Sequence, residues 1–364
     1  MKRTLLQLNL WSVTLLLVLS VGRAQPSQKY YDARERAAET LTFEWTQQQQ
    51  VRVSEDLVRS MNNLKLNQAQ SLGIPTEQIT LLDTRALTHT IFETADYFTI
   101  ERTPKWTRMR SLYQTISLDQ ARVSDRLYHD EVCFGSGVVL AIHRTNQGEV
   151  ASVDIAECED DVFGLGNPFS NITPEYLVLL GGVSPLRLYG HKPEDWKLVS
   201  SNPEEWVFEL IAPPQERSVR IWLDRRYQDA PSKIEVRYSH GDVYVWRVLK
   251  YKRIEGTWFP SEVEHWRRSA LEEVLARLVL AGHRRTQSIE LKIPDGIAVR
   301  DWRSLGRKAW DWRGEQVEQI EWSDGLRQSL GVARSEEPRR RRPPSRRRGF
   351  LNTAGVPSSK TTGR

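Results

Sequence analysis

The sequence has 364 residues, of which 39% are hydrophobic, so it can bury the core of one large or two medium domains. Its formal net charge is +5, but residues 1–24 carry +3 and residues 331–364 carry +8, which leaves −6 for residues 25–330. Because nucleic acid is itself acidic, this distribution argues against specific nucleic-acid binding by the folded body.

The N-terminus has the form of a secretory signal peptide. Lys2 and Arg3 give a positive start, an apolar stretch runs from Leu10 to Val21, and small residues follow at the spacing of a cleavage site, so we expect cleavage after about Ala24. The apolar stretch is short for a membrane span, and a retained anchor is the alternative. No later segment has about 18 uninterrupted apolar residues, so we expect a soluble periplasmic or secreted protein.

Helical signals come first after the signal peptide. Apolar residues recur at helical spacing over residues 27–41, where alanine and glutamate also favour a helix. Residues 43–53 are typical of an extended segment. Ser54 precedes two acidic residues, which predicts the start of a second helix, and Gly73 and Pro75 end it.

From about residue 85 the pattern changes to the two-residue period of β-strands. The strand-length runs are residues 96–102, 105–114, 125–132, 137–143 and 149–157. A capping residue, a proline and an acid follow in order at Thr173-Pro174-Glu175, which predicts a short helix that ends at Gly181–Gly182.

The strongest strand pattern covers residues 196–266. Short gaps rich in proline, glycine and aspartate separate its runs, and Ile234, Val236 and Tyr238 alternate with charged residues. This pattern predicts an antiparallel meander with one buried face and one solvent-exposed face. The large number of adjacent strands predicts a large curved sheet. Residues 269–291 suit a helix by composition, but their position favours a strand from about Ala276.

One run in this region combines a strand with a proline. Pro260 has no N–H group, so it belongs at a sheet edge, at a strand start or in a bulge. Trp258 and Trp266 share a nominal face with Glu262 and Glu264, which indicates a mixed surface or a change of face at a bulge. The tryptophans either fill the core or form the wall of an apolar groove.

A series of short motifs resembles the hairpins of the LolA-like superfamily. A strand ends at Asp224, a turn contains Pro231, a glycine turn follows at Gly241, the next strand reaches Gly256-Thr257-Trp258-Phe259-Pro260, and a later segment is Pro294–Asp301. The chain is similar in this order of motifs to periplasmic lipoprotein carriers and to the related anti-sigma regulator domain.

The resemblance covers roughly residues 28–302 and implies a mainly β fold with a few helices (α+β). The expected fold is a curved antiparallel sheet that forms an incomplete β-barrel with helices in its opening. We expect four segments, which are the signal peptide 1–24, the LolA-like domain 25–302, a C-terminal extension 303–330 and a disordered basic tail 331–364. The tail has seven arginines in ten positions together with prolines and cannot bury a core.

The resemblance also implies a function. We expect an exported, non-enzymatic protein that binds a hydrophobic ligand, a lipid or the acyl chain of a lipoprotein, in its curved sheet. The candidate ligand-binding residues are aromatic residues on consecutive strands: Trp222, Tyr238, Tyr244, Trp246, Trp258 and Trp266. The alternative is an envelope sensor or scaffold module that acts through protein–protein contacts and fills the sheet with its own side chains.

The arginine-rich tail has its own possible partner. It could bind an anionic envelope surface by charge, or it could simply solubilise the chain. Its lack of interleaved aromatic residues argues against recognition of nucleic-acid bases.

No motif for catalysis or metal binding is present. The seven histidines are scattered without paired-ligand spacing, so we expect no metal site, no cofactor and no enzymatic activity. Cys133 and Cys158 fall near the ends of neighbouring predicted strands, and export would permit a disulfide that contributes about 3 kcal/mol. Two unpaired thiols are the alternative, and no neighbouring group marks either cysteine as a nucleophile.

Overall fold

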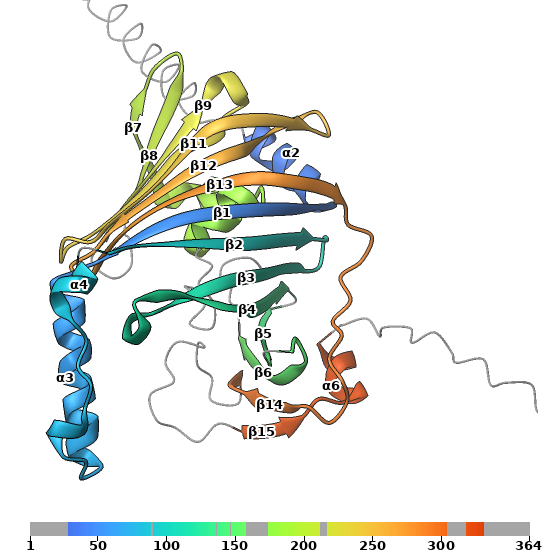
Figure 1. Cartoon of the computed structure of the whole chain (residues 1–364). Helices are drawn as coiled ribbons and strands as arrows, with labels where there is room; N and C mark the ends of the chain where they lie inside the picture. Colours follow the sequence, from blue (N-terminus) through green and yellow to red (C-terminus); the bar gives the residue numbers. More distant parts are fainter. Residues whose placement is uncertain are drawn as a thin grey trace, which may run out of the picture.

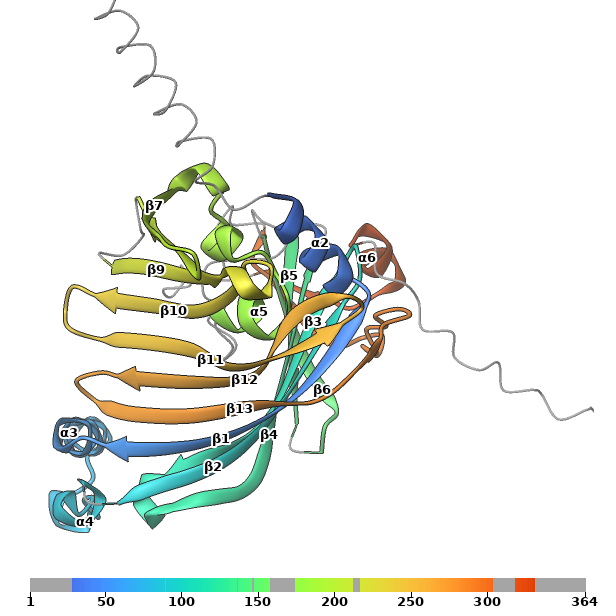
Figure 2. The same cartoon turned by 90° about the horizontal axis from the view of Figure 1, so that it is seen from above.

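The computed structural model describes residues 28–88, 90–135, 137–145, 147–157, 174–211, 217–303 and 318–330. Its strands form one fifteen-stranded sheet in the order β15-β14-β6-β5-β4-β3-β2-β1-β13-β12-β11-β10-β9-β8-β7. Every pairing in it is antiparallel except that of β14 with β6. The sheet is strongly curved and its two outermost strands, β15 and β7, are not neighbours (Figure 1 and Figure 2). The predicted fold class, a mainly β protein built on an unclosed curved sheet, is therefore confirmed.

The strands of the first part of the chain are β1 (Leu41–Val53), β2 (Ile91–Arg102), β3 (Thr107–Ser117), β4 (Arg122–Gly135), β5 (Val138–Arg144) and β6 (Val150–Glu157). The strands of the second part are β7 (Trp196–Ser201), β8 (Glu205–Leu210), β9 (Arg217–Asp224), β10 (Ala230–Tyr238), β11 (Val243–Ile254), β12 (Thr257–Arg268), β13 (Glu272–Arg285), β14 (Ala298–Asp301) and β15 (Glu318–Glu321). The helices are α2 (Gln28–Ala38), α3 (Glu55–Ser71), α4 (Thr84–Thr88), α5 (Pro174–Leu180) and α6 (Asp324–Ser329), with short 3-10 turns that include η3 (Pro185–Gly190) and η5 (Arg225–Tyr227).

Strand β1 joins the two parts of the sheet. It pairs with β13 from Leu41↔Arg285 to Val53↔Glu272, and on its other side with β2. The segment 269–291, which suited either a helix or a strand, forms β13 from Glu272 and lies beside the N-terminal strand.

The helices form where the sequence gives start and stop signals. Ser54 caps α3, because its Oγ accepts a hydrogen bond from the Leu57 backbone N–H at 3.1 Å. Gly73 follows the helix with φ +68°, a left-handed conformation that suits glycine. Helices α3 and α4 lie together at one end of the sheet (Figure 1).

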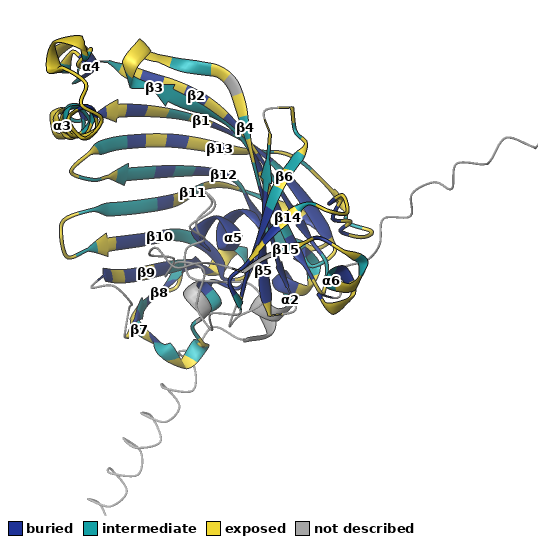
Figure 3. Ribbon diagram, turned by 90° about the horizontal axis from the view of Figure 1, so that it is seen from below, coloured by how far each residue is buried: buried dark blue, intermediate teal, exposed yellow. Residues whose placement is uncertain are grey.

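The concave face of the sheet, which carries Ile234 and Val236, contains the main core. Helix α5 packs there against β10 and β12, and all seven of its residues are buried. Figure 3 shows the helix within the curve of the sheet. A helix as apolar as the Tyr176–Leu180 part of α5 is stable only when it is covered on all sides, which this position provides.

Pro260 lies in β12 at a position where its missing N–H group costs no hydrogen bond to β13. Pro260 pairs with Tyr251 next to a register shift, and the pairing of β12 with β13 begins only at Glu262↔Val279. The missing N–H group of Pro260 therefore lies outside the hydrogen-bonded pairing of β12 with β13. At the preceding hairpin, Glu255 and Gly256 both have positive φ, which is typical of the type I′ turn.

Several sequence expectations concern residues outside the described ranges. These are the signal peptide 1–24, Cys158 and the tail 331–364. Within the described part of the predicted extension 303–330, β15 pairs with β14, and Trp322 and Leu330 are buried in a second core cluster. None of the described helices is long and apolar enough to span a membrane.

Candidate functional site

A row of aromatic rings in stacked or edge-to-face contact crosses the concave face from β10 to β2. The centroid distances are 5.7 Å from Tyr238 to Tyr244 and 6.1 Å from Tyr244 to Trp246. They are 4.6 Å from Trp246 to His265, 5.9 Å from His265 to Tyr176 and 5.7 Å from Tyr176 to Phe98. We call this row the aromatic ladder, and its members are Tyr238, Tyr244, Trp246, His265, Tyr176 and Phe98.

Strand register places the ladder on the concave face. Trp246 pairs with Ile234 on one side and with His265 on the other, and Tyr244 pairs with Val236. Paired residues share a face, and Ile234 and Val236 are fully buried core residues. Three of the predicted ligand-binding residues, Tyr238, Tyr244 and Trp246, therefore lie together on the side that faces the core.

The other three predicted residues lie on the convex face, so the expectation of one shared groove wall is wrong for them. Trp222 pairs with Lys233, Trp258 with Arg253, and Trp266 with Leu275. Each is the immediate sequence neighbour of an inward residue, Ile221, Phe259 or His265. Successive side chains of a strand point to opposite faces, which separates the two sets.

A buried hydrogen-bonded network joins the ladder to the neighbouring strands. The Tyr176 hydroxyl donates to Gln47 Oε1 at 3.2 Å and lies 3.2 Å from His265 Nδ1. Gln47 Nε2 donates to Asp96 Oδ2 at 3.1 Å. Since the hydroxyl proton goes to Gln47, His265 Nδ1 carries a proton and donates to the tyrosine oxygen.

The protonation of this network follows from its burial. Burial lowers the pKa of His265 to about 3, and the nearby charge of Arg267 acts in the same direction. Burial raises the pKa of Asp96, although hydrogen bonds from Gln114 and Gln47 oppose it. His265 is therefore neutral at pH 7. Its buried Nε2 is an acceptor without a hydrogen-bond partner among the described residues.

The Tyr238–Tyr244 end of the ladder is the more accessible one. Both rings are half-buried, whereas Trp246 is only 1% exposed. The Arg217 guanidinium lies 5.9 Å from the Tyr238 ring, and that of Arg267 lies 5.9 Å from the Tyr244 ring. The ladder thus runs from a partly open mouth, where Arg267 is paired with Glu272, to a buried interior that α5 covers.

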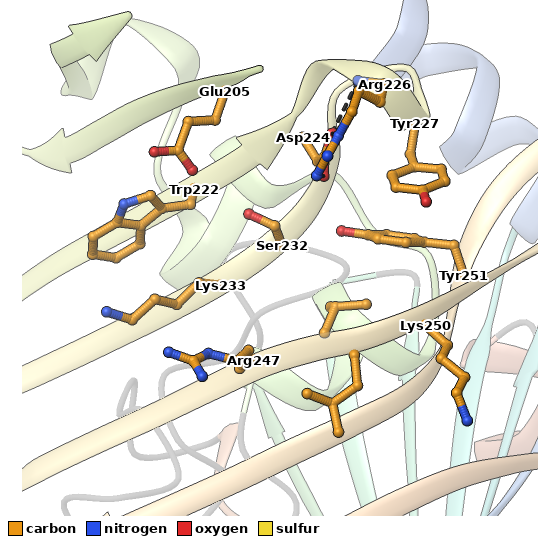
Figure 4. Close-up of a pocket in the computed structure, with 12 residues that line it drawn as sticks. Glu205, Trp222, Asp224, Arg226, Tyr227, Ser232, Lys233, Arg247, Lys250 and Tyr251 are labelled. Carbon is orange, nitrogen blue, oxygen red and sulfur yellow. Dashed lines mark hydrogen bonds and ion pairs between the residues drawn. The ribbon is translucent and has the colours of Figure 1, made fainter. Parts of the chain in front are cut away.

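A separate pocket of about 630 Å³ lies on the convex face over β9, β10 and β11 (Figure 4). We call it the convex pocket. Its charged and aromatic lining residues are Glu205, Trp222, Asp224, Arg226, Tyr227, Lys233, Arg247, Lys250 and Tyr251. The sequence predicted only Trp222 of these, and it predicted that residue for the other face.

Sequence reasoning also missed the polar members of the concave site. Gln47 and Gln49 follow Phe43 and Trp45 in the alternation of β1, so they fall on the apolar face. Polar side chains at these positions were the signal that could have located the network. Tyr176 gave no such signal, because its partners come from distant strands.

The described residues include possible metal ligands and the thiol of Cys133. Among them, no group of three or more His, Cys, Asp or Glu side chains could hold a metal ion. Cys133 is fully buried, and burial raises the pKa of its thiol well above the ordinary value. Its pairing with Cys158 stays a prediction, which titration of free thiols in the exported, denatured chain would test.

Fold and site together define an open, curved β-sheet protein with an aromatic interior. No family model matches the sequence, and no curated protein matches it. One similar solved structure is an outer membrane lipoprotein-sorting protein domain from Vibrio parahaemolyticus, with 10% identity and a TM-score of 0.33, covering 72% of this chain and 92% of that one. A DUF1329 family protein from Desulfovibrio piger has 8% identity and a TM-score of 0.32, covering 73% and 95%.

Proposed function

We propose that this protein is an exported, non-enzymatic carrier or binding protein that holds a hydrophobic molecule, such as the acyl chain of a lipid or lipoprotein, on its concave face. The observation that carries the proposal is the aromatic ladder, which leads from the half-buried Tyr238 and Tyr244 to the buried Trp246 on a sheet that does not close. The secretory form of the N-terminus supports a place in the cell envelope.

The ladder suits an acyl chain in both chemistry and energy. Burying a chain contributes about 0.8 kcal/mol per CH2 group, so ten buried groups give roughly 8 kcal/mol before the cost of immobilising the ligand. Arg217 and Arg267 flank the mouth, where an anionic head group would compete with the Tyr238 hydroxyl and the Glu272 carboxylate that they already contact. Binding of this kind requires no catalytic residue.

Binding of a fluorescent fatty acid tests the proposal. Tyr244→Asp places a charge at the half-buried mouth, and we expect it to weaken probe binding at least about tenfold, because an acyl chain would then contact a carboxylate. The matched control is Trp266→Asp, which changes an aromatic residue on the convex face of the adjacent strand and should leave binding unchanged. Circular dichroism of both variants must remain that of a β protein.

An envelope sensor or scaffold is the second candidate, and one observation favours it. All seven residues of α5 are buried on the concave face, so the chain fills part of that face with its own side chains. If the wild-type protein binds no fatty-acid probe and lipid extraction followed by mass spectrometry finds no bound lipid, the carrier proposal is wrong and the scaffold function replaces it.

A further inference from the structure

The convex pocket has the size and position of an independent ligand site. Its volume of about 630 Å³ falls within the range of small-molecule sites. It lies across the sheet from the aromatic ladder, because Trp222 and Lys233 form a pair on the face opposite to that of Ile221 and Ile234. A ligand there would not compete with an acyl chain on the concave face.

Positive charge predominates among the groups that the pocket and its rim present. The buried carboxylate of Glu235 receives hydrogen bonds from Lys233 at 2.7 Å and from Arg237 at 2.5 Å. The buried Glu262 likewise pairs with both Lys250 and Arg277. Two cations on each carboxylate leave one positive charge in excess at each position, whereas in the lining Asp224 is paired with Arg226 and Glu205 adds a further carboxylate.

Arg247 lies between these two groups and adds a further charge. It pairs in register with Lys233 on β10 and with Glu264 on β12, its side chain is exposed, and no salt bridge found among the described residues involves it. Figure 4 shows Lys233 and Arg247 side by side below Trp222. A guanidinium in this position can bind a phosphate or carboxylate with two parallel hydrogen bonds.

Aromatic rings bound the pocket at both ends. Trp222 lies at one end, with the Lys233 ammonium 4.2 Å from its ring centroid. At the other end Tyr227 and Tyr251 stack with centroids 4.1 Å apart, and the Tyr251 hydroxyl donates to the Pro231 carbonyl at 3.0 Å. Fixed rings of this kind offer flat apolar surfaces, while Glu205 and Ser232 offer hydrogen-bonding groups between them.

We propose that the convex pocket binds an anionic saccharide, a sugar that carries a phosphate or carboxylate. The acidic group would pair with Arg247 and Lys233, the ring faces would pack on Trp222 or Tyr251, and the hydroxyls would bond to Glu205 and Ser232. The source of such a group is either a free acidic oligosaccharide or the head group of a glycolipid, since both present the same chemistry.

Calorimetric titration of the full-length protein with a phosphorylated disaccharide tests this site. Arg247→Gln should weaken binding about tenfold, the effect of losing a charge-assisted hydrogen bond. Arg52→Gln, which removes an exposed arginine from the convex face of β1 far from the pocket, should leave binding unchanged. Tyr244→Asp should also leave it unchanged, which separates this site from the acyl-chain site.

Comparison with other ligands shows which groups of the saccharide the pocket recognises. Weaker binding of the dephosphorylated disaccharide supports the role of charge, and equal binding would overturn it. Inorganic phosphate or a mononucleotide that binds as tightly as the phosphorylated disaccharide would overturn the saccharide assignment. Binding to vesicles that contain a phosphorylated glycolipid, with competition by the free disaccharide, identifies the head group as a source; binding of the free form alone identifies the oligosaccharide.

Discussion

His265 occupies the centre of the aromatic ladder, stacked on Trp246 at an interplanar angle of 3° and bonded to Tyr176. A histidine in an apolar position usually serves as a weakly polar core residue, and burial keeps this one neutral. Its uncharged state allows it to hold α5 against the sheet without an ion-pair partner. The same state makes the residue sensitive to acid.

Stability should therefore fall between pH 7 and pH 5. The folded pKa of His265 is about 3 and its unfolded value is 6.5, so the unfolded chain binds the additional proton as the pH falls below 6.5. This residue should cost about 2 kcal/mol of stability at pH 5 relative to pH 7. Asp96 acts in the opposite sense at acidic pH, because its raised pKa favours proton binding by the folded state.

Urea unfolding of His265→Phe isolates the contribution of this one residue. The variant keeps an aromatic ring beside Trp246 but cannot titrate, so its stability should depend less steeply on pH than that of the wild type. His283→Phe, at an exposed position of β13, is the control and should preserve the wild-type slope. Identical slopes for His265→Phe and the wild type would contradict a buried neutral histidine.

At the scale of single elements, α5 is held by its C-terminal turn. Gly182 has φ +69°, and a Cβ atom there would lie 2.7 Å from both Ala38 Cβ and Phe259 Cε1. The glycine allows α2, α5 and β12 to meet at one point. The sequence showed that Gly181–Gly182 would end the helix, but it did not show that three elements approach one another there.

Gly182→Ala should destabilise the protein by about 2–4 kcal/mol, from backbone strain together with overpacking. Gly73→Ala is a matched control, because Gly73 has nearly the same φ of +68° and no atom within 4 Å of its Cβ position. The control should cost only about 1 kcal/mol. Equal losses of unfolding free energy in urea titrations would show that the contact at Gly182 relaxes freely.

The elements themselves could largely be predicted, because a strand's period of two is a local property of the sequence. The alternation of Ile234, Val236 and Tyr238 gave β10 its inward face. Which aromatic residues share a site could not be predicted in the same way. The face of each side chain depends on whether its position in the strand is odd or even relative to the buried residues. Trp222 and Trp246 therefore lie on opposite faces despite similar surroundings in the sequence.

At the scale of the whole molecule, the segment after residue 303 divides into two parts. Trp322 is 1% exposed and Leu330 is 3% exposed, and both belong to the core cluster beneath β5, β6 and β14. Arg327 donates to the Ile293 carbonyl and so ties α6 to the segment before β14. The sequence indicated an extension here but did not indicate that it adds a strand to the sheet.

Two truncations distinguish these parts. A chain that ends at Leu330 should keep the melting temperature of the full protein, because residues 331–364 are too rich in arginine and proline to form a core. A chain that ends at Arg303 loses β15, Trp322 and α6, so its melting temperature should fall by several degrees or more. A large drop in the first truncation would show that the tail packs on the body.

The central position of β1 has a consequence for the order of folding. Thr42 on β1 and Thr286 beside β13 are 244 residues apart in sequence, yet their hydroxyls lie 2.8 Å apart. Loop closure on that scale is entropically costly, and sheets built on distant pairings form slowly. The two halves of the sheet can therefore pair through β1 and β13 only after most of the chain has been synthesised. If the chain is exported as proposed, this delay would keep the incomplete sheet open until translocation has delivered its last central strand.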